Sequence, residues 1–298
     1  MATSARDGES RKSDPIRLSR RLLLTLGGAA FVAACNPGRE AATWRDPAAA
    51  AAPVNVYPTP IPTPTPTSTQ PSTTPPTPWV PATPVKPVPG VCPHISGIVD
   101  QPGGPQHYLP CHGTNIALTI DDGPSPTYTP QILALLAKYQ IAATFCMIGR
   151  NAAANPSLVA AVADHGHHIA NHTYTHPLSL PQLTPTQISD EINRTSDTLN
   201  QLAHGTAPRL FRAPGGNWSQ AILAACAKAG LHPLDWSVDP RDWSLPGVPH
   251  IADVILTRTR PGAIILDHDG GGNRQQTVQA LAIALPRLLD AGYTFAQP

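Results

Sequence analysis

The chain has 298 residues, and its 20 Lys and Arg nearly balance its 19 Asp and Glu. Without residues 1–34, fourteen basic residues remain against sixteen acidic ones, a net charge of about −2 that argues against nucleic acid as a partner. The composition changes sharply along the chain, and only residues 114–298 have the mixture of apolar and polar residues that a folded domain needs.

An export signal is predicted at the N-terminus. Arg20 and Arg21 precede an apolar stretch, residues 22–34, which is too short to span a bilayer as a mature helix but suits a signal peptide. The sequence VAAC ending at Cys35 resembles a bacterial lipobox. By that resemblance residues 1–34 are removed, Cys35 carries lipid, and the exported protein is anchored on the outer face of the cell membrane. Twin-arginine export and a short uncleaved anchor remain alternatives.

Residues 36–90 predict a disordered linker. Pro and Thr dominate residues 53–89, with almost no charge or large apolar side chains, so this stretch cannot build a core. A short lead-in, residues 91–113, follows the linker and carries Cys92 and Cys111. We expect a disulfide between these two cysteines, because exported chains can form them. Cys146 and Cys226 lie in apolar segments, where buried thiols are expected.

Residues 114–298 alternate short apolar runs with helical patterns, which indicates a β/α domain. Seven strands are predicted, at residues 115–121, 142–149, 168–171, 209–213, 233–238, 263–267 and 293–296. Six helices are predicted, at residues 129–139, 157–165, 185–203, 219–229, 251–259 and 275–291. Thr184 and Gln187 are placed to form a capping box on the third helix. Seven strands are too few for an eight-fold barrel, so we expect an incomplete, distorted (β/α) barrel, with a doubly wound open sheet as the alternative.

Two adjacent carboxylates end the first predicted strand. Asp121 and Asp122 lie in the run TIDDGP, at the edge of the sheet where α/β proteins usually bind ligands. Successive strand residues point to opposite sides, so the two carboxylates should have different partners. Asp-Gly-Pro is also ordinary turn chemistry, so this motif alone leaves both interpretations open.

A pair of histidines follows the third predicted strand. His172 and His176 are four residues apart, and both imidazoles can reach one ion if the chain coils between them. With Asp122 they leave open positions on a divalent ion, as catalytic metal sites do. Nitrogen ligands favour zinc, cobalt or a similar transition metal. A His-rich loop that is merely solvated is the alternative.

With three further motifs, residues 114–298 resemble the polysaccharide deacetylases of carbohydrate esterase family 4, whose catalytic unit is the NodB-homology domain. The five motifs, in chain order, are TIDDGP at 119–124, HTYTH at 172–176, RAPGG at 212–216, DPRDW at 239–243 and LDH at 266–268. The resemblance implies that Asp121 is the catalytic base and that Asp122, His172 and His176 bind the metal. It also implies the predicted barrel.

The resemblance further implies a substrate site that includes Pro214, Gly215, Trp243 and Leu266. Gly215 stands where the family often has an aromatic residue. One wall of the sugar site is therefore expected to be more open, with Trp218 or Trp243 taking over part of it.

The implied reaction is hydrolysis of an acetyl group from an N-acetylated sugar, with Asp121 taking a proton from water. Arg212 is expected to hold Asp121 ionised, and His268 is expected to protonate the leaving nitrogen, as an amide requires. Asp242 would raise the pKa of His268 and keep it protonated. Turn or surface roles are the alternatives for Arg212, Asp242 and His268.

The expected substrate is a polysaccharide with N-acetylated sugars, peptidoglycan first, because the anchor and linker would hold the enzyme at the wall. Chitin-like oligomers and acetylated xylan are alternatives of the same class. A carbohydrate-binding lipoprotein on an inactive deacetylase fold is the alternative of a different class. The sequence does not determine the polymer, the bound metal or the oligomeric state, for which a monomer is the simplest expectation.

Overall fold

A computed structural model of the chain describes residues 78–93, 98 and 100–298. These residues belong to one compact unit, Ser72–Pro298. The expected signal peptide, the lipidation site Cys35 and most of the expected linker lie outside the described residues. Within the described residues, no helix has both the length and the hydropathy that a bilayer span requires.

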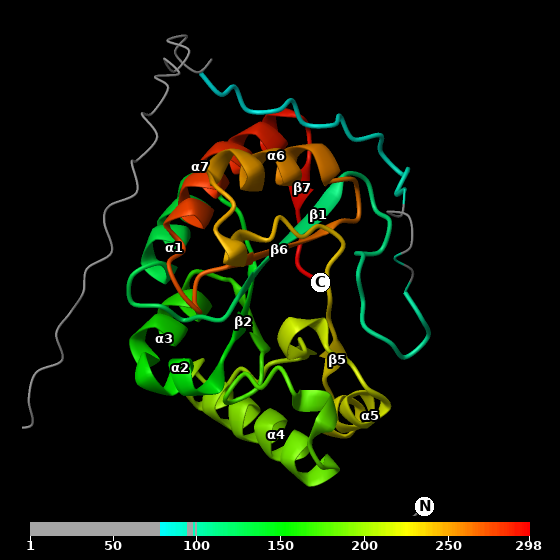
Figure 1. The fold of residues 1–298 in the computed structure, drawn as a ribbon, viewed down its shortest axis with the longest axis vertical. Helices are drawn as coiled ribbons and strands as arrows, with labels where there is room; N and C mark the ends of the chain where they lie inside the picture. The colour runs from blue at the N-terminus through cyan, green and yellow to red at the C-terminus, as the bar shows by residue number, and fades with distance from the viewer. Residues whose placement is uncertain (1–77, 94–97, 99) are drawn as a thin grey trace, which may run out of the picture. The chain divides into compact units, whose positions relative to one another are not determined.

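Seven parallel strands form the sheet (Figure 1). Their bounds are β1 Asn115–Asp121, β2 Thr144–Met147, β3 His168–Asn171, β4 Leu210–Phe211, β5 His232–Pro233, β6 Ile264–His268 and β7 Thr294–Phe295. The order is β5-β4-β3-β2-β1-β6, with β7 paired to the start of β1. The order from β1 to β5 runs in one direction, and β6 lies on the other side of β1, as in a barrel that curls back on itself. A parallel bridge between Val238, after β5, and Ile265 of β6 joins the two ends of this order. An open doubly wound sheet would leave those ends apart, so the predicted incomplete (β/α) barrel is confirmed.

In the described part of the chain, seven α-helices lie around the strands (Figure 1). Their bounds are α1 Thr129–Tyr139, α2 Gly149–Ala154, α3 Pro156–Asp164, α4 Pro185–Leu202, α5 Gln220–Ala229, α6 Val248–Arg258 and α7 Gln275–Asp290. The six predicted helices agree with these to within a few residues, and the capping box of Thr184 and Gln187 on α4 is confirmed. Helix α2 was not predicted. It begins at Gly149, which the sequence analysis assigned to the preceding strand.

Residues of the lead-in close the gap between β5 and β6. Gln106 makes a parallel bridge with Leu234 after β5, and Tyr108 makes an antiparallel bridge with Ala263 before β6. The Leu109 N–H donates to the carbonyl of Gly262 at 2.8 Å. The disulfide between Cys92 and Cys111 ties together the two ends of this segment. The lead-in is therefore part of the barrel wall.

The last residues of the predicted linker also differ from the expectation. Residues 79–85 lie along α6 rather than standing free of the domain, because Asp253 of α6 offers them an acceptor, and the Gly90 N–H donates to the carbonyl of Gly113. The Asp253 carboxylate accepts the Trp79 indole N–H at 3.1 Å and the Ala82 backbone N–H at 2.8 Å. Ala82 also packs against the main apolar core.

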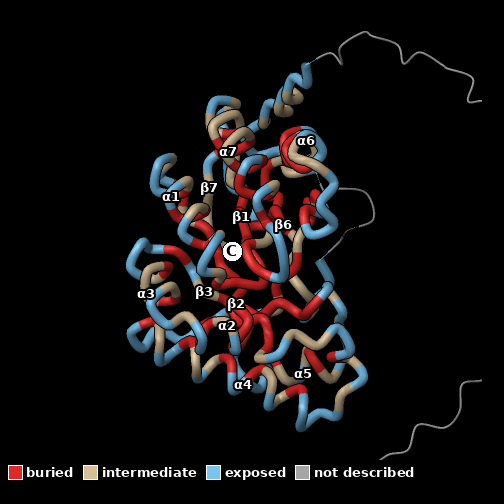
Figure 2. Tube along the Cα trace, turned by 60° about the vertical axis from the view of Figure 1, so that its left-hand side comes forward, coloured by how far each residue is buried: buried red, intermediate tan, exposed pale blue. Residues whose placement is uncertain are grey.

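The core lies between the sheet and the helices, and the buried strands run through the centre of the domain in Figure 2. A smaller cluster combines three small residues of neighbouring strands, Ala117, Cys146 and Ala170, with four larger aliphatic residues, Leu109, Leu210, Leu234 and Ile264. Cys146 and Cys226 are free and buried, as predicted.

Candidate active site

The predicted motifs meet in one cleft of about 600 Å³ at the carboxyl ends of the strands. Residues from all five motifs line the cleft: Asp121, Asp122, His172, His176, Leu178, Gly215, Asn217, Trp236, Asp239, Trp243, Leu266, His268, Gly271 and Arg274. Parallel strands place their carboxyl ends at the same edge, which explains how segments 150 residues apart in sequence meet here.

Asp122, His172 and His176 form a compact cluster with metal-ligand character. One possible ligand atom from each lies within 4.8 Å of the others. Asp122 Oδ1 lies 3.6 Å from His172 Nε2 and 3.3 Å from His176 Nε2, and no hydrogen bond satisfies this buried oxygen. A buried carboxylate oxygen without a donor, facing two imidazoles, fits a divalent ion.

The loop after β3 brings the two histidines together by turning sharply. Thr173 and His176 adopt left-handed backbone conformations, with φ of 62° and 59°. The Glu191 carboxylate of α4 accepts the backbone N–H groups of Tyr174 and Thr175, both at 2.8 Å. Glu191 thus orients the segment between the histidines, a role that the sequence analysis missed.

Hydrogen bonding fixes which nitrogen of His172 faces the cluster. Its Nδ1 lies 2.8 Å from the carbonyl oxygen of Arg212, which can only accept, so Nδ1 carries the proton and Nε2 faces Asp122. Burial opposes protonation of His172, but the carboxylates of Asp121 and Asp122 outweigh it and raise its pKa. Burial raises the pKa of Asp122, but the nearby histidines outweigh it and leave its pKa well below the ordinary value. A bound cation would take the place of these protons.

Asp121 and Arg212 form a buried ion pair beside the cluster. Arg212 Nη1 donates to Asp121 Oδ1 at 2.7 Å and to the Thr119 hydroxyl at 2.8 Å, and Nη2 donates to the Asp235 carbonyl at 2.8 Å. The arginine is fully buried, whereas Asp121 lines the cleft. Asp122 has a positive φ of 74°, which turns the chain so that both carboxylates approach His172. Asp121 and Asp122 nevertheless have different main partners, as expected.

His268 faces the cleft from the end of β6 and is paired with Asp242. Its Nδ1 lies 2.7 Å from Asp242 Oδ1, and its backbone N–H donates to Asp242 Oδ2 at 2.9 Å. The Thr277 hydroxyl of α7 donates to the same Oδ2 at 2.7 Å. Burial lowers the pKa of His268, but the hydrogen bond to Asp242 and the surrounding carboxylates outweigh it and raise the pKa to about 9.

Three of the four expected substrate residues, Gly215, Trp243 and Leu266, line the cleft. Pro214 differs from the expectation: it is buried and does not line the cleft, because it starts the 3-10 turn Pro214–Gly216 that presents Gly215. A Cβ on Gly215 would lie only 3.2 Å from Leu178 Cδ2. Leu178 therefore occupies the space beside Gly215.

Several lining residues were not found from the sequence. Leu178, Asn217 and Arg274 lie outside the five motifs, and no pattern in the sequence singles them out. Trp218, suggested as a wall, instead packs on Phe211 and donates its indole N–H to Asp235 at 2.9 Å. Trp236 and Trp243 both line the cleft, and a Cβ on Gly216 would lie 2.9 Å from Trp236 Cη2.

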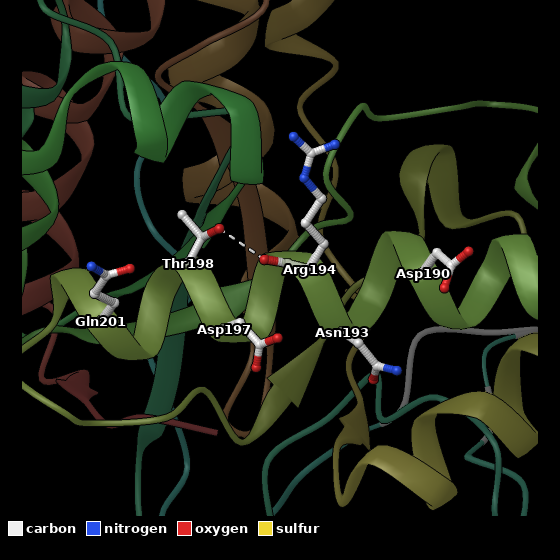
Figure 3. A pocket seen from close by; sticks show the side chains of 6 residues that line it. All are labelled: Asp190, Asn193, Arg194, Asp197, Thr198 and Gln201. Carbon is white, nitrogen blue, oxygen red and sulfur yellow. Dashed lines mark hydrogen bonds between the residues drawn. The ribbon is translucent and has the colours of Figure 1, made fainter. Parts of the chain in front are cut away.

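Another depression lies on the outer face of α4 (Figure 3). Six residues from that one helix line it: Asp190, Asn193, Arg194, Asp197, Thr198 and Gln201. The side chains spread along successive turns and do not converge on a common point, and the Thr198 hydroxyl bonds to the helix backbone (Figure 3). This is the solvent face of an amphipathic helix rather than a reactive site.

The fold and the site define a protein of the β/α-barrel class with a candidate metal centre. A family profile described as polysaccharide deacetylase matches residues 110–234. A chitooligosaccharide deacetylase of a Bradyrhizobium species is 41% identical over 200 residues, which cover 63% of this chain and 91% of that protein. A peptidoglycan-N-acetylglucosamine deacetylase of Bacillus cereus is 43% identical over 182 residues, which cover 60% of this chain and 84% of that protein.

A solved structure of a peptidoglycan N-acetylglucosamine deacetylase, Bc1960, is also similar. It superposes with a TM-score of 0.62 at 35% identity and covers 64% of this chain and 89% of that one. The chain belongs to the polysaccharide deacetylases of carbohydrate esterase family 4.

Proposed function

We propose that this protein is a metal-dependent hydrolase that removes N-acetyl groups from the GlcNAc residues of peptidoglycan. One observation carries the proposal: a single cleft holds a buried Asp-His-His cluster between an arginine-paired carboxylate and a carboxylate-paired imidazole. Amide hydrolysis needs an electrophile for the carbonyl, a base for water and an acid for the leaving nitrogen.

Asp122, His172 and His176 would hold the ion, which we take to be zinc or another divalent transition metal because two of the three ligands are imidazoles. Such an ion polarises the acetyl carbonyl and lowers the pKa of water. One carboxylate and two neutral imidazoles would neutralise a divalent ion only in part, so the site would keep the positive charge that a developing oxyanion needs.

Asp121 is the proposed base. Its carboxylate lies 3.7 Å from His172 Nε2, next to the cluster but outside it, and can accept a proton from the attacking water. The Arg212 guanidinium donates to Asp121 Oδ1 at 2.7 Å, which fixes the direction of the carboxylate and balances its charge.

His268 is the proposed acid. A pKa of about 9 keeps the imidazole protonated at neutral pH, so it can give its Nε2 proton to the leaving nitrogen. Asp242 accepts the Nδ1–H and thereby leaves Nε2 facing the cleft. Trp236, Trp243 and Leu266 provide apolar surface for the acetyl methyl group and the faces of sugar rings.

Acetate release from peptidoglycan, chitin oligomers and acetylated xylan, measured side by side before and after chelation, tests the proposal. Peptidoglycan should give the highest kcat/KM, chelation should abolish release, and zinc or cobalt should restore it. Higher activity on chitin oligomers or xylan would select the alternative substrate. Binding of glycan without acetate release, with metal present, would select the non-catalytic lipoprotein instead.

We also propose that the protein is exported and lipid-anchored through Cys35, with the Pro/Thr-rich stretch as a spacer. At ~3.1 Å per residue, residues 53–77 would reach about 80 Å if fully extended. Because residues 79–85 lie along α6, a shortening variant should remove residues 54–76 only. We expect normal rates on soluble oligomers and reduced deacetylation of intact wall in cells at matched protein levels. Equal wall deacetylation would refute the spacer role, and loss of membrane attachment in Cys35→Ala tests the anchor.

A further inference from the structure

Arg274 is a buried arginine in the wall of the cleft that no catalytic step uses. It lies at the start of α7, directly after the glycine turn at residues 270–272. Its side chain lines the cleft although the residue is only 4% exposed. A Cβ on Gly271 would lie 3.3 Å from Arg274 Nη2 and 2.5 Å from Asp122 Oδ2. The bare glycine therefore lets the guanidinium lie beside the metal cluster.

The guanidinium of Arg274 has no acidic partner. Its Nε donates to the Gly270 carbonyl at 2.6 Å, but within the described part of the chain Nη1 and Nη2 make no hydrogen bond and no carboxylate lies within 4.0 Å. Arg212, the other buried arginine of the site, has an aspartate at 2.7 Å. An arginine cannot neutralise itself by losing a proton. Nη1 and Nη2 of Arg274 are not among the buried side-chain atoms that lack a partner, so both keep surface that a ligand in the cleft can reach, and the ligand can supply the counter-charge.

The two aspartates of the site do not serve as the acidic partner of Arg274. Asp121 is already paired with Arg212, and Asp122 faces two histidines. Two parallel N–H donors at the wall of a substrate cleft match the geometry of a carboxylate, which a guanidinium binds with two hydrogen bonds. Among the residues that line the cleft, Arg274 alone is a lysine or an arginine.

We propose that Arg274 binds a carboxylate carried by the sugar next to the one that is deacetylated. This inference rests on the proposed function and specifies its substrate class: an acidic glycan rather than a neutral one. In peptidoglycan, the lactyl ether of the neighbouring sugar provides such a carboxylate where no peptide is attached to it. A neutral GlcNAc oligomer would leave the guanidinium unpaired, and a site with an unpaired buried group discriminates against such a ligand.

The experiment compares three tetrasaccharides as substrates of the full metal-loaded enzyme. One alternates GlcNAc with lactyl-bearing sugars that have free carboxylates, the second is the same glycan with the lactyl groups converted to methylamides, and the third is a GlcNAc oligomer. The wild-type enzyme should prefer the carboxylate form over the methylamide by about tenfold or more in kcat/KM, because a bond to a charged group is lost in the methylamide. Raising the salt concentration should reduce this preference.

Arg274→Met should abolish the preference by lowering kcat/KM for the carboxylate form more than for the methylamide. Arg274→Lys should restore part of it, since it keeps the charge but not the two-pronged donor. Arg287→Met, which removes the same charge from the last turn of α7, should retain the wild-type preference. The ratio of kcat/KM for the two substrates, measured on one enzyme preparation, does not depend on how much of the enzyme is folded.

Equal loss on the carboxylate and methylamide forms in Arg274→Met would overturn the proposal and assign Arg274 to the support of Asp122. Weaker inhibition by acetate with an unaltered preference would overturn it too, because Arg274 would then bind the acetate product. No deacetylation of any of the three glycans would instead be a failure of the proposed function.

Discussion

On one side of the cleft, Arg212 is fully buried and Asp121 faces the cleft; on the other, Asp242 is fully buried and His268 faces the cleft. Both pairs join a carboxylate oxygen to a nitrogen at 2.7 Å. In each pair the group placed to react is the one that borders the cleft, and its buried partner holds it in place through a short hydrogen bond. The two sides differ in one respect: a guanidinium keeps its charge at every relevant pH, whereas an imidazole can lose its proton.

Removing the cluster between the two sides should have the largest effect. His172→Ala should lower the metal content and reduce the deacetylation rate by about 10³-fold or more, because several kcal/mol of charge stabilisation are lost. The metal bound per chain and acetate release measure this. His168→Ala, at the other end of β3, is the matched control and should retain both. Wild-type metal content and activity in His172→Ala would refute the metal site.

A substitution of Asp121, the proposed base, should lower both the rate and the stability of the protein. Asp121→Asn should retain metal but lose about 10²- to 10⁴-fold in rate. The free energy of unfolding should fall by about 3 kcal/mol, since Arg212 is left as a buried charge that cannot be neutralised. Denaturant titration and single-turnover kinetics check the two effects. Asp197→Asn on the outer face of α4 is a control for loss of a carboxylate (Figure 3). A fully active Asp121→Asn enzyme would remove Asp121 as the base.

A substitution of His268, the proposed acid, should affect substrates differently according to whether their leaving group must be protonated. His268→Ala should reduce hydrolysis of an N-acetyl sugar by about 10²-fold or more, because the amine leaves only when protonated. Esters with activated leaving groups need no proton and should lose less. The same enzyme preparation should be assayed on both substrates. Equal losses would indicate that His268 is not the acid.

The pH dependence of kcat/KM should distinguish the His268–Asp242 pair, which can lose a proton, from the Arg212–Asp121 pair, whose arginine keeps its charge. The raised pKa of His268, about 9, means that the acid form is present at neutral pH and that activity falls as pH rises through that value. Asp242→Asn removes the interaction that raises the pKa and leaves the burial that lowers it, so the alkaline limb of kcat/KM should move to lower pH. The acidic limb, which reports the base side, should stay in place. An unmoved alkaline limb would contradict the assignment.

The smallest expected effect lies on the base side, through the lead-in. His107 lies 3.5 Å from Asp235 and 3.1 Å from Asp100, and Arg212 donates to the Asp235 carbonyl. His107→Gln should lower kcat by about two- to fivefold, as expected for a partly exposed pair, and leave the alkaline limb unchanged. His204→Gln breaks an exposed pair with Asp164 and serves as control. A shift of the alkaline limb in His107→Gln would show that the two sides are not independent.

Much of the fold could be predicted because β1, β3 and α1 follow strong local patterns of apolar residues, and their predicted bounds match the structure. Strands β4 and β5 are only two residues long and are shorter than predicted, because their extent depends on pairing with neighbours. Helix α2 follows β2 without a recognisable start signal, since its N-cap Ile148 makes no side-chain hydrogen bond.

For the site, the ordered motifs identify Asp121, Asp122, His172, His176 and His268 as candidates by their chemistry and spacing. They do not identify Glu191, Thr277 or Asp235. A carboxylate or hydroxyl on a helix or after a strand is common on protein surfaces, and its role becomes visible only when its partner is known. Leu178 and Arg274 were missed for the same reason.

The sequence by itself determined the β/α alternation, the order of the motifs and the kinds of groups available for catalysis, because these depend on local periodicity and side-chain chemistry. Only the tertiary structure decided that the lead-in joins the barrel wall, that residues 79–85 lie along α6 and that Arg274 borders the cleft without an acidic partner. Those features depend on contacts between residues far apart in the chain, whose energies appear only once the strands have paired and water has been excluded.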